Sequence, residues 1–116
     1  MNHLSSIQFK ILIAKAIEGL PTEIKIRLEN IQLLVDLYPS DDQLLGTGLE
    51  NKLNLLSLYE GIPLDDRYGY DEILPDKITL FQESLESISN TEDELINEIQ
   101  STLNLEISQH IESTQD

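Results

Sequence analysis

The chain contains no cysteine and no tryptophan. Without cysteine it cannot form a disulfide framework, a thiolate zinc site or a cysteine nucleophile. Positive charge is also scarce, because seven Lys and Arg residues accompany 22 Asp and Glu residues and leave a formal net charge of −15. Such a charge repels nucleic-acid phosphates and anionic lipid headgroups. We therefore expect a protein that binds neither nucleic acid nor membrane.

Long apolar runs are lacking as well. The most apolar stretch near the N-terminus, residues 9–17, is interrupted by Lys10 and Lys15 and is too short to cross a membrane. No small-residue cleavage site follows it, so we expect a cytoplasmic protein. The negative charge itself has two interpretations that stay open: it keeps the protein soluble, or it forms a docking surface for a basic partner.

The length and the apolar content fit one domain. The 116 residues are 40% hydrophobic, mostly Leu and Ile, which is enough for one aliphatic core. We expect a single domain over residues 1–116, with residues 113–116 frayed.

Capping patterns predict a helix near each end of the chain. Ser5 followed by Gln8 predicts a first helix from about residue 6 to residue 18, and Thr91 followed by Glu94 predicts a last helix that ends near residue 111. In the first helix, apolar residues recur at helical spacing and predict the buried face, namely Ile7, Ile11, Ala14 and Ile17.

The middle of the chain favours strands. Alternating apolar residues and turn residues predict three strands, at residues 30–38, 53–59 and 77–81. Three segments are less regular: residues 22–28 fit a helix or a strand, residues 43–51 a loop or partial helix, and residues 84–89 one helical turn. We therefore expect an α+β fold, with a small mixed sheet of about three strands packed against an N-terminal helix and a long C-terminal helix.

The last helix combines an apolar stripe with ionisable residues. On a helical wheel the stripe contains Leu95, Ile96, Ile99, Leu103, Ile107 and Ile111. Glu106 and His110 fall inside this stripe, one turn apart, while Leu105 and Gln109 fall to one side of it. Either Glu106 and His110 form a satisfied pair at the edge of the core, or they are what remains of an active site.

Several segments, in this order and spacing, carry a family resemblance. They are EGLP at residues 18–21, LEN at 28–30, LYEGIPL at 58–64, YG at 68–69 and LPDKITLF at 74–81. Together they resemble the minimal zincin metallopeptidases, a family of small bacterial domains. The resemblance implies a last helix that carries HExxH, in which two histidines one turn apart bind zinc and the glutamate activates water.

The family frame falls on residues 105–110, which read LEISQH. By this resemblance Glu106 takes the general-base position and His110 that of an additional histidine after the motif. The zinc-ligand positions of the family correspond to Leu105, Gln109 and Gln115. Leucine has no lone pair and glutamine offers only a neutral amide oxygen, whereas a catalytic zinc needs three protein ligands and an open position.

Three functional hypotheses follow from this frame. In the first, no zinc cofactor is expected, peptidase activity is lost, and the domain acts as a binding or regulatory module, with an unknown protein or peptide in the old cleft beside a sheet edge. In the second, the chain is an active metallopeptidase that uses unusual ligands. In the third, it is an acidic interaction protein for a basic partner.

Two further groups are candidates for binding. Arg67, Tyr68 and Tyr70 form a polar aromatic loop that either faces a partner or covers the core with its rings. The only histidines are His3, expected in a mobile N-terminus, and His110. A replacement metal site that unites both histidines with Glu106 and Asp116 is conceivable but has no support in the sequence.

Overall fold

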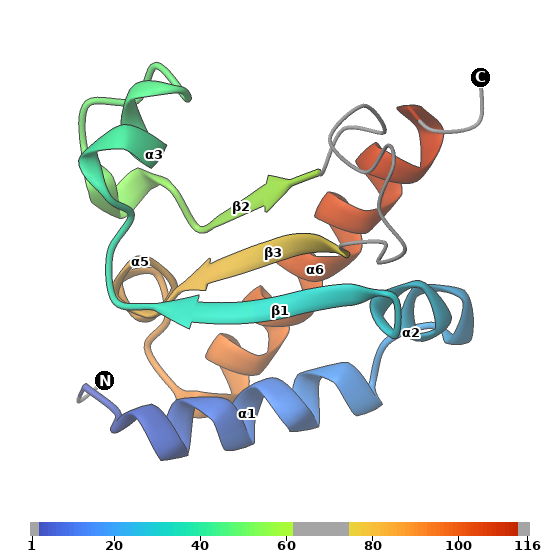
Figure 1. The fold of residues 1–116 in the computed structure, drawn as a ribbon. Helices are drawn as coiled ribbons and strands as arrows, with labels where there is room; N and C mark the ends of the chain where they lie inside the picture. The colour runs from blue at the N-terminus through green and yellow to red at the C-terminus, as the bar shows by residue number, and fades with distance from the viewer. Residues whose placement is uncertain (1–2, 62–74, 114–116) are drawn as a thin grey trace.

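A small mixed sheet lies at the centre of the fold (Figure 1). The computed structural model describes residues 3–61 and 75–113, with side chains as far as residue 110. The described elements are, in chain order, α1 (Ser6–Glu18), α2 (Thr22–Leu28), β1 (Ile31–Asp36), α3 (Asp41–Leu45), the 3-10 helix η1 (Lys52–Asn54), β2 (Ser57–Glu60), β3 (Asp76–Phe81), α5 (Gln82–Ser87) and α6 (Glu92–Ser113). The strand order is β1-β3-β2, with β1 parallel and β2 antiparallel to β3. The predicted α+β fold is confirmed.

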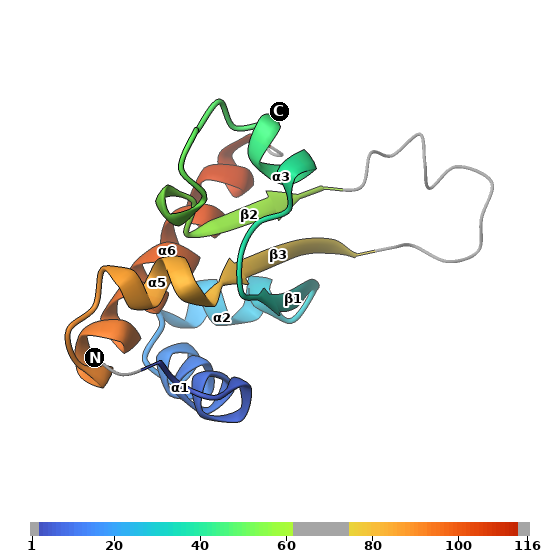
Figure 2. The ribbon, with the colours of Figure 1, turned by 90° about the vertical axis from the view of Figure 1, so that its left-hand side faces the viewer.

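The helices α1 and α6 pack together on one side of the sheet (Figure 2). Side chains alternate along β3, so Ile78 and Leu80 point into the core that these helices share. Tyr59 of β2 pairs with Ile78 and packs against the same core, which leaves Leu58 and Glu60 on the opposite face. The sheet therefore has one face covered by helices and one face on which β2 presents these two side chains.

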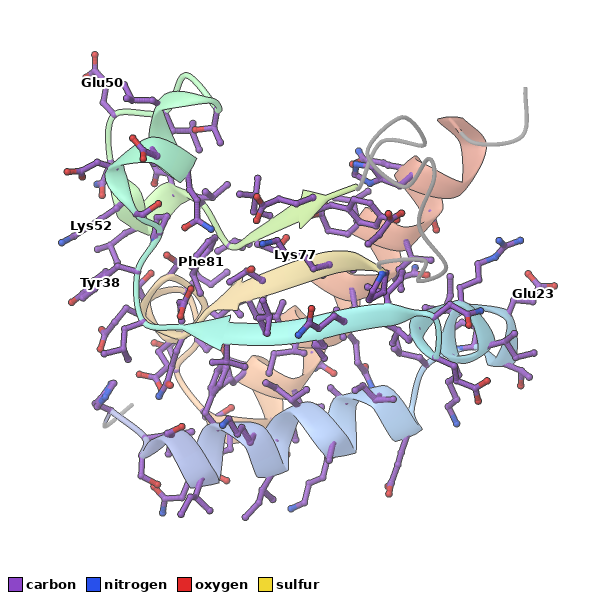
Figure 3. The ribbon with its side chains drawn as sticks, in the orientation of Figure 1. Glu23, Tyr38, Glu50, Lys52, Lys77 and Phe81 are labelled. Carbon is purple, nitrogen blue, oxygen red and sulfur yellow. The ribbon has the colours of Figure 1, made fainter. Side chains whose placement is uncertain are left out.

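The opposite face of β3 ends in a residue that is buried outside the main core. Phe81, the last residue of β3, is fully buried although it does not belong to the main core (Figure 3). The Nζ atom of Lys52 lies 4.0 Å from the centroid of the Tyr38 ring, at the same end of the sheet. This contact is a cation–π interaction, and it links η1 to the segment that leaves β1.

The bounds of α1 match the prediction, but the predicted buried face is wrong. Ile7 and Ile11 are 74% and 51% exposed. The buried residues instead are Phe9, Leu12, Ile13 and Ala16. Both sets have helical spacing, so the period alone does not choose between them. Packing against α6 selects the set with Phe9, because burial of an aromatic ring removes a large apolar area from water.

The structure settles one open prediction for the middle of the chain and corrects another. Residues 22–28 are helical, which settles the choice between helix and strand. The predicted strand at residues 53–59 is wrong in its first half, where η1 forms and β2 begins only at Ser57. The side chain of Asn51 accepts a hydrogen bond from the backbone N–H of Leu53, 2.9 Å away, and this local bond favours the 3-10 turn over an extended strand.

The last helix, α6, begins at Glu92 and confirms the predicted stripe as far as Ile107, while the side chain of Ile111 lies outside the described residues. Four of its members are almost completely buried, namely Leu95, Ile99, Leu103 and Ile107. Over the part of the chain that the structure describes, no helix is both long enough and apolar enough to cross a bilayer.

Candidate functional site

The C-terminal half of α6 and the adjacent strand β2 form the frame of the candidate site. At the start of α6, the hydroxyl of Thr91 accepts a hydrogen bond from the backbone N–H of Glu94 at 3.1 Å, as an N-cap does. Farther along, Leu103 and Ile107 are 0% and 1% exposed, and their burial determines which way the helix is rotated. This rotation determines which of the side chains at residues 105–110 face the core and which face solvent.

The two zinc-ligand positions lie on an exposed flank of α6. Leu105 is 58% exposed, and Gln109, one turn farther along, is exposed too. A hydrocarbon side chain cannot donate electrons to a metal ion, and a neutral amide is a poor ligand for zinc. The residues at these two positions therefore do not fit the zinc ion of the family.

His110, a residue of α6, packs against the sheet. Its ring stacks on the ring of Tyr59, with centroids 3.8 Å apart and planes inclined by 6°. Its Nδ1 atom lies 2.8 Å from the backbone carbonyl oxygen of Glu106. Because a carbonyl oxygen only accepts hydrogen bonds, Nδ1 carries a proton in this arrangement. The hydroxyl of Tyr59 in turn donates to Asp76 Oδ2 at 2.7 Å.

This arrangement modifies the expected pairing of Glu106 with His110. Both residues are half-buried, as their place in the stripe predicts. The contact between them, however, runs to the backbone of Glu106 and not to its carboxylate. Tyr59 is a further residue of this site, and it is not among those that the sequence singles out. The signal was present, because Tyr59 lies in the LYEGIPL segment and its alternation with Leu58 places it on the core face.

Several predicted site residues lie outside the described residues. These are Arg67, Tyr68 and Tyr70 of the polar aromatic loop, and Gln115 and Asp116 near the C-terminus. Their proposed roles in binding or metal ligation stay predictions.

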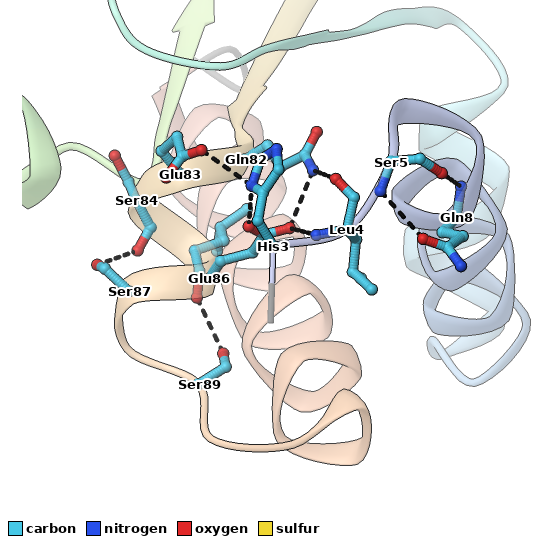
Figure 4. A network of polar contacts seen from close by, with 11 residues as sticks. His3, Leu4, Ser5, Gln8, Gln82, Glu83, Ser84, Glu86, Ser87 and Ser89 are labelled. Carbon is cyan, nitrogen blue, oxygen red and sulfur yellow. Dashed lines mark hydrogen bonds and ion pairs between the residues drawn. The ribbon is translucent and has the colours of Figure 1, made fainter. Parts of the chain in front are cut away.

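The other histidine, His3, is not part of the α6 frame. Its Nδ1 atom lies 2.8 Å from Glu86 Oε1 and 2.9 Å from Glu83 Oε1, both on α5 (Figure 4). The helix α5 follows the C-terminal end of β3, whereas Tyr59, the contact of His110, pairs with Ile78 in the first half of β3. The two histidines therefore lie at different ends of the sheet, and a metal site that unites them is excluded. In the structure His3, which is expected in a mobile N-terminus, contacts Glu83 and Glu86 of α5.

His3, Glu83 and Glu86 are, among the described residues, the group that can hold a metal ion. One ligand atom from each lies within 4.8 Å of the others. The sequence places the two glutamates one turn apart, but nothing in it connects them with a histidine 83 residues before Glu86.

A hollow of about 310 Å³ lies between α3 and the outer face of β2. It is lined by Asp42, Gln43, Gly46, Thr47, Leu58 and Glu60. Among the described strands β2 pairs only with β3, so no strand from residues 3–61 or 75–113 covers its other edge. The hollow offers an acidic, partly apolar surface beside β2, whose outer edge pairs with no other described strand.

Comparison with known families gives one match. The profile of the zincin-like metallopeptidases matches residues 28–116, a range that contains all three described strands and α6. A comparison with curated protein sequences found no significant match. The matched range includes both the LYEGIPL segment and the motif frame at residues 105–110. The chain therefore belongs to the zincin-like metallopeptidase family.

Proposed function

We propose that this chain is a zincin-like domain without zinc-dependent peptidase activity, and that it binds an extended peptide beside β2. The observation that carries the proposal is the side chain at the first ligand position of the motif, the 58% exposed Leu105. The first zinc-ligand position of the motif is exposed and has room for a metal-binding side chain. In this chain it carries leucine, whose side chain is a hydrocarbon.

The loss of zinc removes the chemistry that the family motif performs. A zinc ion lowers the pKa of bound water to about 7 and so supplies hydroxide at neutral pH. Glu106 alone offers only a general base, which contributes about 10²–10⁴-fold in favourable cases. Enzymes typically accelerate their reactions by about 10⁶–10¹⁷-fold, so a general base alone is too weak for turnover to be detected in a peptidase assay.

The surface around β2 supports peptide binding. No described strand other than β3 pairs with β2, and a strand edge is a place where an extended peptide can add as a further strand. The adjacent hollow offers Leu58 for an apolar side chain, and Asp42 and Glu60 for a basic one. A peptide that alternates apolar and basic residues fits this combination.

Peptidase activity is tested with a library of fluorogenic peptides, in the presence and absence of ZnCl₂. Wild-type protein and Glu106→Gln are compared at equal concentration. We expect the same background turnover for both. Zinc-dependent turnover that disappears in Glu106→Gln would overturn the proposal, and it would establish an active peptidase with unusual ligands.

Peptide binding is tested with an array of extended peptides in which apolar residues alternate with lysine. Leu58→Arg places a cation in the hollow and should abolish binding. Leu45→Arg is a matched control, because Leu45 is 79% exposed on α3 and does not line this hollow. Equal binding by both variants would show that the peptide does not use this surface.

A second candidate function rests on charge alone. The net charge of −15 supports capture of a basic protein by the general acidic surface, without use of the β2 edge. The Leu58→Arg and Leu45→Arg variants would then weaken binding to the same extent, since each adds one positive charge.

A further inference from the structure

The group formed by His3, Glu83 and Glu86 has the composition of a metal site. An imidazole nitrogen and two carboxylate oxygens are common ligands of zinc, at about 2.0–2.2 Å from the ion. Around a tetrahedral ion such ligands lie roughly 3.3 Å from one another. The present distances from Nδ1, 2.8 and 2.9 Å, need to increase by only a few tenths of an ångström to admit one.

The carboxylate of Glu86 is already oriented toward this point. Its Oε2 atom accepts hydrogen bonds from Gln82 Nε2 at 2.9 Å and from the backbone N–H of Leu4 at 3.3 Å. Gln82 Nε2 also donates to the carbonyl oxygen of Leu4 at 2.8 Å. The other oxygen, Oε1, is thus directed at His3 (Figure 4). Outer hydrogen bonds of this kind fix the orientation of metal ligands and are part of such sites.

The charges of the group favour a cation. The side chain of Glu86 is only 7% exposed and that of Glu83 29%, and both face the same nitrogen. Among the described residues no lysine or arginine forms an ion pair with either carboxylate. With a neutral His3, two negative charges would stand side by side in a partly desolvated place, which is unfavourable. A divalent ion neutralises both of them.

We propose that His3, Glu83 and Glu86 bind a divalent transition-metal ion, of which Zn²⁺ is the probe of choice. The site lies outside the family motif and does not depend on the proposed function. Three ligands leave a fourth position for water, and the side chain of His3 is 53% exposed, so the ion is reached from solvent. Because the ligands come from the N-terminal segment and from α5, the ion fastens this segment to the body of the domain.

The competing occupant of the site is a proton. A protonated His3 contacts both carboxylates in the same geometry, as an ion pair. A metal ligand must be deprotonated, so metal and proton exclude each other at Nδ1. Saturable metal binding that is lost without the His3 imidazole shows that the site takes a metal ion. Without such binding, the occupant is the proton alone.

The experiment is titration calorimetry of the full chain with ZnCl₂ after chelator treatment. We expect one zinc per chain for the wild type. Affinity should fall at least tenfold in His3→Gln and in Glu83→Gln. Glu23→Gln is a matched control, because it removes one negative charge from α2, at the other end of the molecule from α5 (Figure 3). Its zinc affinity should equal that of the wild type.

Thermal unfolding provides a second readout that does not rely on calorimetric heats. Zinc at a hundredfold excess over its dissociation constant should raise the midpoint of the wild type by roughly 10 °C, and that of His3→Gln much less. Far-UV circular dichroism checks that each variant is folded. No saturable binding up to millimolar zinc would overturn the proposal, as would unchanged affinity in both His3→Gln and Glu83→Gln. Affinity lost in His110→Gln but kept in His3→Gln would also overturn it, by placing the ion at the family motif.

Discussion

The rotation of α6 decides the functional conclusion, and a pair of identical substitutions tests it. Leu103 and Leu105 lie two residues apart on the same helix, yet Leu103 is fully buried and Leu105 is 58% exposed. Replacement of each by alanine removes the same atoms from the same secondary structure, with the same small change in helix propensity. Any difference in stability between the two variants therefore reports the environment of the side chain.

The structure predicts a large difference between these variants. Leu103→Ala leaves a cavity in the core between α6, α1 and β3, and such a change costs about 2–5 kcal/mol. Full burial of a leucine contributes about 1.5–3 kcal/mol, and Leu105 loses less than half of its exposed area on folding, so Leu105→Ala should cost about 1 kcal/mol or less. The difference between the two should be at least about 1 kcal/mol.

Urea denaturation followed by far-UV circular dichroism measures this difference. For a domain of this size the slope should be about 1–1.5 kcal/mol per molar urea and equal in both variants. The midpoint of Leu103→Ala should then lie at least about 0.7 M lower than that of Leu105→Ala. Equal midpoints would mean that α6 is rotated differently from the structure. Residue 105 would then not be a ligand position that faces solvent.

Three further predictions follow from the site. The double variant Leu105→His and Gln109→His restores two imidazoles one turn apart, so titration calorimetry should find one more bound zinc per chain than in the wild type. An unchanged stoichiometry would count against the alignment of this helix with the family motif. His110→Ala should leave the zinc uptake of the chain unchanged but lower the free energy of unfolding by about 0.5–1.5 kcal/mol, because the stacking on Tyr59 is lost; loss of metal uptake would instead support an active site with unusual ligands. Binding of lysine-containing peptides should weaken steeply between 0.05 and 0.5 M NaCl if the acidic surface contributes, and affinity that persists at about 1 M salt would contradict an electrostatic contribution.

Short-range patterns determined much of this protein. The reciprocal hydrogen bonds between Ser5 and Gln8 start α1 where the capping pattern places them. The 3.6-residue period of the last helix placed Glu106 and His110 near the core and Leu105 on the exposed flank, as the structure confirms. The poor fit of the motif to a zinc ion also follows from the identities of residues 105 and 109 alone. These features depend on neighbours within one or two helical turns, which the sequence contains directly.

Contacts between distant segments were decided only by the tertiary structure. The first helix carries two apolar faces of similar period, and its packing against α6 buries the face with Phe9. His3 meets Glu86 across 83 residues of chain, and His110 finds the ring of Tyr59 on another element. No local pattern encodes such pairs, because they form when whole helices and strands come together to bury their apolar surfaces. The metal site that we propose belongs to this second group, while the poor fit of Leu105 and Gln109 to a zinc ion belongs to the first.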